Sequence, residues 1–266
     1  MQSNASELTE MAMIPEIRAV EIDRPWMWLA AGWRDFSRAP MVSLCYGFIF
    51  SVAGYVVIYG LYAVDQFYLI LPLAAGFTLV GPVAAVGLYD VSRRLESGQP
   101  VTLGAALRSF LSHAGTISAM GLVLMLFLLA WIRIALLIFA LFFGGKAIPP
   151  GNFIEVVFFA PESLPFVIIG TVVGAILATS VFAISAISLP MLLDRNVGVP
   201  TAVVASFRAV NKNPQAMALW AALIAGFTAF GIATLFVGLT VCLPLVGYAS
   251  WHAYRDLIGE EGTVSL

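Results

Sequence analysis

The sequence contains little charge. Of its 266 residues, 11% are Asp, Glu, Lys or Arg and 61% are apolar, and the mean hydropathy is +0.97. A soluble globular domain carries about 25% charged residues. So few charged side chains cannot cover the surface of a chain this apolar in water. The composition therefore predicts a protein whose solvent is the lipid bilayer.

Residue types that bind metals or act as nucleophiles are also scarce. The chain has two histidines, His113 and His252, and two cysteines, Cys45 and Cys242, which lie in apolar runs and are expected to be small buried side chains. Two histidines are too few for a subunit that ligates haems and copper inside the membrane. No phosphate-binding loop, dinucleotide fingerprint or HExxH motif occurs. We expect no enzyme activity, no cofactor, no metal and no nucleic-acid partner.

The apolar segments are long enough to cross a membrane six times. A spanning helix needs about 20 apolar residues, because each adds 1.5 Å against a core of about 30 Å. The run 214–254 would form a single helix of roughly 60 Å, so we expect two spans there, with a turn near Phe230-Gly231. The expected spans are residues 41–64, 67–89, 114–142, 163–193, 214–230 and 231–254.

The basic residues predict the orientation. Of the 13 Lys and Arg, all except Lys146 and Arg133 precede the first span or follow spans two, four and six. Basic loops stay in the cytoplasm, so both termini are expected there. The predicted organisation is a polar N-terminal tail at 1–25, a six-span domain at 26–258 and a short tail at 259–266.

A short sequence motif that recurs before alternate spans predicts an internal repeat. Residues 32–40, 106–114 and 206–214 each place an arginine between apolar residues spaced i, i+3, as on one face of a helix. The fold class that follows is all-α, with three units at about 26–98, 99–198 and 199–258. Each unit is a cytoplasmic amphipathic helix followed by two spans. The alternative is chance convergence, since basic stretches before spans are common.

Two groups of charged residues are candidate functional sites. Residues near the cytoplasmic interface are expected to form ion pairs, the alternative being a site between the units. They are Arg34, Arg108, Arg208, Asp90, Arg93, Asp194 and Arg195.

The second group centres on Arg133, the charge inside the third expected span. A charge within a span is costly and marks either a function or a partner. We expect Arg133 to pair with Asp65, Glu155 or Glu162 at the outer face, or to contact a substrate or ion.

Several phrases resemble an uncharacterised bacterial family of predicted integral membrane proteins, the domain-of-unknown-function 2189 family. The resemblance extends over about 17–258 and implies a multi-pass protein of the bacterial inner membrane, without implying an activity or functional residues. The phrases are Ile17-Arg18-Ala19-Val20, Ala31-Gly32-Trp33-Arg34-Asp35-Phe36, Gly81-Pro82, Tyr89-Asp90-Val91-Ser92-Arg93-Arg94-Leu95-Glu96 and Ser188-Leu189-Pro190-Met191-Leu192-Leu193-Asp194-Arg195.

Two functions are consistent with this pattern. The first is a non-enzymatic scaffold or accessory subunit, whose partners are the lipid bilayer and either another membrane protein or further copies of the chain. The alternative is a transporter or channel for a small solute or ion. Transporters place several polar groups in the middle of the membrane, and this chain offers mainly Arg133. The pattern therefore favours the scaffold.

Overall fold

The structure is a computed structural model that describes residues 15–105, 108, 114–144, 150–161 and 163–259. The predicted site residue Glu162, Lys146 and most of the second copy of the repeated motif lie outside these residues. Within the described part the chain is helical, and its β-pairing is limited to a bridge between Ile17 and Ile258. In chain order the helices are α2 (Arg24–Arg38), α3 (Pro40–Ala63), η1 (Phe67–Leu69), α4 (Ile70–Ala84), α5 (Val86–Glu96), α7 (Ala114–Phe143), η2 (Pro150–Asn152), α8 (Phe153–Phe159), α9 (Ser163–Ser185), α10 (Ser188–Asp194), α11 (Val199–Lys212), α12 (Pro214–Ala233) and α13 (Leu239–Leu257).

In the described part of the chain, five helical stretches are long and apolar enough to cross a membrane, which confirms an all-helical fold with several candidate membrane spans. The first four match the predicted spans closely, and α12 is the fifth. Helix α13 is not among them, because its last turns carry His252, Arg255 and Asp256. The five stretches are Pro40–Ala63, Phe67–Glu96, Gly115–Phe143, Ser163–Asp194 and Pro214–Ala233.

Two of these stretches break near a proline. Helix α4 gives way to α5 just after Pro82, and α9 gives way to α10 just before Pro190. A proline lacks the N–H that a helix needs, and its ring clashes with the preceding turn. Helix α13, by contrast, continues through Pro244.

The turn between α12 and α13 lies later than predicted. Helix α12 continues past Phe230-Gly231 to Ala233, and residues 234–238 form the turn. Gly231 is a packing position rather than a turn position, because a Cβ there would lie 2.4 Å from Cδ2 of Leu239. The chain instead reverses at Leu235 and Phe236, which have φ values of +54° and +65°.

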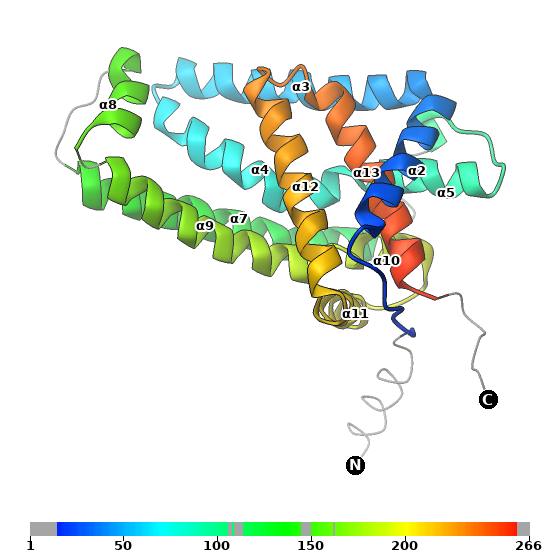
Figure 1. Cartoon of the computed structure of the whole chain (residues 1–266). Helices are drawn as coiled ribbons and strands as arrows, with labels where there is room; N and C mark the ends of the chain where they lie inside the picture. The colour runs from blue at the N-terminus through cyan, green and yellow to red at the C-terminus, as the bar shows by residue number, and fades with distance from the viewer. Residues whose placement is uncertain (1–14, 106–107, 109–113, 145–149, 162, 260–266) are drawn as a thin grey trace.

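Helix α13 lies at the centre of the packing. It contacts α2, α3, α5 and α12, whereas α4, α7 and α9 pack against one another. Figure 1 shows α7 and α9 running together toward α8, with α12 and α13 crossing the other helices. Backbones approach closely at α13, since a Cβ on Gly47 of α3 would lie 2.2 Å from the carbonyl oxygen of Thr240.

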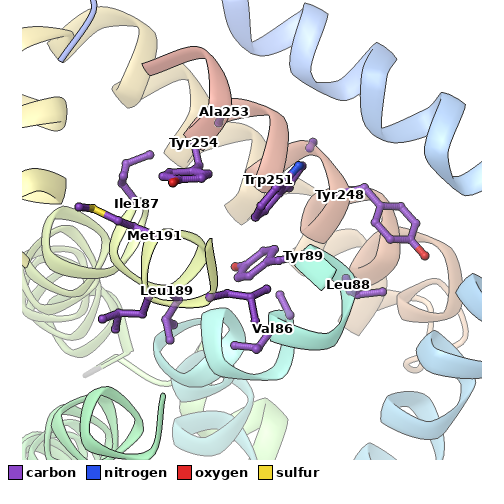
Figure 2. Close-up of a cluster of buried hydrophobic side chains, with 14 of the residues drawn as sticks. Val86, Leu88, Tyr89, Ile187, Leu189, Met191, Tyr248, Trp251, Ala253 and Tyr254 are labelled. Carbon is purple, nitrogen blue, oxygen red and sulfur yellow. The ribbon is translucent and has the colours of Figure 1, made fainter. Parts of the chain in front are cut away.

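Several of the largest buried side chains gather where α5, α10 and α13 meet. Figure 2 shows Tyr89 of α5 facing Trp251 of α13, with Met191 of α10 beside Tyr254. All four side chains are almost fully buried. The main hydrophobic core thus lies at one end of the bundle, next to most of the charged residues.

The segment before α2 is docked onto the helices. The backbone N–H of Arg18 donates to the carbonyl of Leu257 at 2.8 Å, and the N–H of Val20 donates to Oδ1 of Asn213 at 2.8 Å. Lys212 Nζ donates to the carbonyl of Ile17 at 2.6 Å. Residues 15–23, which the sequence places in the polar tail, therefore connect the end of α13 to the junction of α11 and α12.

Candidate functional site

Buried charges concentrate in one region, which we call the charged end. It comprises α2, α5, α10 and the C-terminal half of α13. Its most buried interhelical link is made by Asp35 of α2, which is 4% exposed. Ser92 Oγ of α5 donates to Oδ2 of Asp35 at 2.8 Å, and His252 Nε2 of α13 lies 2.7 Å from the same oxygen. One carboxylate thus joins three helices.

The link continues through Glu96 and Arg255. Nδ1 of His252 lies 3.8 Å from Oε1 of Glu96, and Nε of Arg255 lies 3.5 Å from Oε2. Arg255 also approaches Oδ2 of Asp194 at 3.8 Å, which brings α10 into the network. Signs alternate along the series, so each charge faces an opposite charge or a histidine.

Tyr254 connects Asp194 to the end of the described chain. Its hydroxyl donates to Oδ2 of Asp194 at 2.7 Å and accepts from Nε of Arg195 at 3.1 Å. Arg195 also donates to the carbonyl of Gly259 at 2.6 Å. The loop after α10 is thereby fixed to the end of α13.

Asp90 forms a second buried ion-pair cluster. Its side chain is fully buried, with Oδ1 2.6 Å from Arg93 and Oδ2 2.7 Å from Arg94. Arg93 also donates to the carbonyl of Leu193 at 3.0 Å, which ties α5 to α10. A buried carboxylate is tolerated when its oxygens are paired and hydrogen-bonded in this way.

Asp256 joins the two ends of the described chain. Arg24 donates to both of its carboxylate oxygens, at 2.7 and 2.9 Å, and the indole N–H of Trp28 donates at 2.9 Å. The hydrogen bond to Asp256 raises the pKa of Arg24. This bidentate geometry is the strong form of an arginine–carboxylate contact, and it holds the start of α2 against the last turn of α13.

The contacts of the charged end tie its helices to one another. Ser92 donates to Asp35 rather than to His252, so the histidine is not placed to activate the hydroxyl as a nucleophile. Across the described ranges, no group of three His, Cys, Asp or Glu side chains could hold a metal ion. What the arrangement can do is hold α2, α5, α10 and α13 in one register.

The predicted interface residues divide into two sets. Asp90, Arg93, Asp194 and Arg195 lie within the charged end, in the ion pairs and hydrogen bonds given above. Arg34, Arg108 and Arg208 are exposed on the outside of the helices instead.

Of the second predicted group, the structure describes Arg133, Asp65 and Glu155 and does not bring these three into ion pairs with one another. All three are exposed, and Glu162 lies outside the described residues. Arg133 therefore occupies the outer surface of α7 within a stretch that can cross the membrane.

Several members of the charged end were missed by the sequence reasoning. The most important are Asp35, Glu96 and His252. One local signal was available, because His252, Arg255 and Asp256 share the last turns of an otherwise apolar helix. Their partners could not be identified, since Asp35 and His252 are 217 residues apart in the chain.

Cavities lie between the helices of the described part of the chain, and two of them are well defined. One, of ≈ 640 Å³, is bounded by α4, α5, α9, α12 and α13, together with residues at the junction of α11 and α12. The other, of ≈ 520 Å³, lies between α4, α7, α8 and α9. Among the described residues, neither lining contains an Asp, Glu, Lys, Arg or His side chain, so both are suited to uncharged, largely apolar contents.

Comparison with known proteins gives a family and no nearer relative. Residues 70–194 match the model of a family described as predicted integral membrane protein, DUF2189. This range is narrower than the 17–258 suggested by the resemblance, and it contains α4, α5, α7, α8, α9 and α10. No curated protein and no solved structure matches the chain significantly.

Proposed function

Through residues 70–194 the chain belongs to the DUF2189 family of predicted integral membrane proteins, and from this premise we propose that it is a non-enzymatic scaffold or accessory subunit. It would act in a bacterial inner membrane, with both termini in the cytoplasm. The observation that carries the proposal is that the buried charged side chains are engaged in contacts within the protein. Asp35, Asp90 and Asp194 are engaged in contacts between or within helices at one end, while the described residues of both cavity linings are uncharged.

The three-unit arrangement is part of this proposal. The junction of α2 with α3 and the junction of α11 with α12 have nearly the same geometry, which supports equivalence of the first and third units. Ala39 has φ −129° and ψ 53°, Asn213 has φ −125° and ψ 53°, and each precedes a proline at the start of the next helix. In both units the preceding helix buries one face and exposes basic residues on the other, as a helix at the membrane surface would.

The last two helices are proposed to form a hairpin that ends inside the membrane. Ser51 Oγ donates to the carbonyl of Phe236 at 2.8 Å, and the ring of Tyr55 lies 5.9 Å from that of Phe236. Ser51 and Tyr55 lie roughly 16–22 Å along α3 from Pro40, at 1.5 Å per residue, against a core of about 30 Å. The six predicted crossings would then be four crossings and a re-entrant hairpin.

The composition of the turn supports this placement. Leu235 is 70% exposed and Val237 is 64% exposed, which suits lipid better than water. Thr234 Oγ1 accepts the N–H of Gly238 at 2.9 Å. Internal bonding of this kind is what backbone requires at membrane depth. By contrast, the turn after α3 contains the exposed Asp65.

Single cysteines test the topology. In a chain carrying Cys45→Ala and Cys242→Ala, we expect a membrane-impermeant maleimide to label Asp65→Cys in right-side-out vesicles and Arg208→Cys in inside-out vesicles. Val237→Cys should react in neither preparation and only after SDS is added. Labelling of Val237→Cys in right-side-out vesicles would instead establish six crossings.

Co-purification tests the scaffold function. We expect the full chain, extracted from its native membrane in a gentle detergent, to migrate in a stoichiometric complex identified by native-size analysis and mass spectrometry. The variant Arg34→Glu/Arg208→Glu should lose the partner while remaining monodisperse, because both side chains are exposed and neither takes part in the hydrogen bonds and ion pairs described for the charged end. Arg133→Glu serves as the matched control on another exposed arginine. A chain that migrates alone contradicts the proposal.

Transport is the second candidate, and Arg133 is the observation that favours it. This arginine is exposed within an apolar helix, where a charge usually has a function. Solute flux in proteoliposomes that depends on the chain and is lost in a folded Arg133→Met variant would support transport. Flux that is absent in both proteins would leave the scaffold as the better account.

A further inference from the structure

The larger cavity contains an orphaned polar group. Ser185, near the C-terminal end of α9, is 1% exposed, lines the cavity, and its hydroxyl makes no hydrogen bond. Other helical serines behave differently, since Ser180 and Ser250 each donate at 2.8 Å to the carbonyl four residues earlier. A buried hydroxyl without a partner costs about 1–3 kcal/mol. A bound molecule that pairs with Ser185 would offset this cost.

The cavity is mostly apolar and contains a few polar side chains. Tyr89, Ser185, Asn211 and Ser250 line it from four different elements, and threonines of α4, α9 and α12 line it as well. The rest of the lining is mostly aliphatic or aromatic. The site therefore offers a hydrogen-bonding group at Ser185 beside extensive apolar surface.

The cavity has an opening suited to entry from the bilayer. Thr179 of α9 and Ala225 of α12 line it and are also exposed. Both helices are apolar and long enough to cross the membrane, so the gap between them faces lipid. Its volume of ≈ 640 Å³ lies within the range of about 300–1,000 Å³ typical of small-molecule sites.

We propose that this cavity binds an uncharged single-chain amphiphile, with its small hydrogen-bonding head at Ser185 and its apolar chain between α4, α9 and α12. The head is uncharged because the described lining residues offer no ion to pair with it, and a charge there would lose its hydration without compensation. A hydroxyl or carbonyl head fits Ser185, which can donate one hydrogen bond and accept two. The site does not depend on the scaffold function.

A photoactivatable alcohol tests the site. The full chain in phosphatidylcholine nanodiscs is equilibrated with a long-chain alcohol that carries a diazirine in its chain, and with the matching diazirine alkane, which has no hydroxyl. We expect the alcohol to label cavity residues of α9, α12 or α13 more strongly than the alkane, and oleyl alcohol to compete. Equal labelling by the alkane would mean that ordinary acyl chains fill the space, and would overturn the proposal.

Matched variants separate the site from the lipid-facing surface. Ala221→Phe, which fills the cavity, should abolish specific labelling, whereas Ala222→Phe on the exposed neighbouring position should not. Ser185→Ala should weaken competition by oleyl alcohol roughly 3- to 10-fold, the value of one hydrogen bond. Ser180→Ala, outside the lining, should leave it unchanged. Unaltered competition in a monodisperse Ser185→Ala variant would overturn the role of this head-group site.

Discussion

Replacing both arginines around Asp90 should be among the most damaging changes to this protein. In Arg93→Met/Arg94→Met the carboxylate of Asp90 stays fully buried and loses both cationic partners. Removing the partner of a buried charge costs about 3–5 kcal/mol. At 2–4 °C per kcal/mol, the midpoint of thermal unfolding in dodecyl maltoside should fall by roughly 6–20 °C. Tryptophan fluorescence, with size-exclusion chromatography as a second readout, measures the shift.

Two further variants show whether charge is the cause. Adding Asp90→Asn to the double variant removes the unpaired charge, so part of the lost stability should return. Arg34→Met/Arg38→Met removes two exposed arginines from α2, and we expect a change of no more than about 0.5 kcal/mol. Equal loss in the two double variants would show that the buried pairing of Asp90 does not stabilise the fold.

The spans were predictable because they depend on a local property. A run such as 163–193 has no charged residue, and length against membrane thickness then requires a helix. The structure confirms this segment as Ser163–Asp194. Such conclusions need only a short window of sequence.

The end of α13 could not be predicted in the same way. Up to Trp251 its residues read as an apolar span, so the sequence favoured a sixth crossing. In the structure its second half packs against α2 and α5, and His252 reaches Asp35. These partners belong to segments far away in the chain. Only the three-dimensional arrangement shows that an apolar helix can face protein rather than lipid.

The sequence predicted those contacts of the candidate site that are local in the chain, and not those between distant segments. Asp90 and Arg93 are three residues apart, so their pairing on one helical face follows from helix geometry, and the structure brings them to 2.6 Å. The pair of Arg24 with Asp256 spans 232 residues and had no local signal. The sequence identified Arg133 as a charge within a span. It could not identify the neighbours of Arg133, because these depend on how α7 is rotated about its axis.

Helices α3 and α13 approach each other closely at Gly47. A Cβ at Gly47 would lie 2.2 Å from the carbonyl oxygen and 2.7 Å from the carbonyl carbon of Thr240. The obstacle is backbone, so a change of rotamer cannot relieve it. We expect Gly47→Ala to destabilise the protein by about 1–3 kcal/mol or more, measured as a lower unfolding midpoint in detergent.

Gly60 provides the control on the same helix. A Cβ there meets nothing within 4 Å, and alanine is favoured over glycine in a helix by about 1 kcal/mol, so Gly60→Ala should be neutral or stabilising. If Gly47→Ala behaved like Gly60→Ala, the contact between α3 and α13 would be wrong, and with it the depth assigned to the α12–α13 turn. If the two variants diverge as expected, close backbone packing at small residues stabilises this bundle. In lipid such packing takes the place of the hydrophobic effect between helices, while the charged end fixes their register.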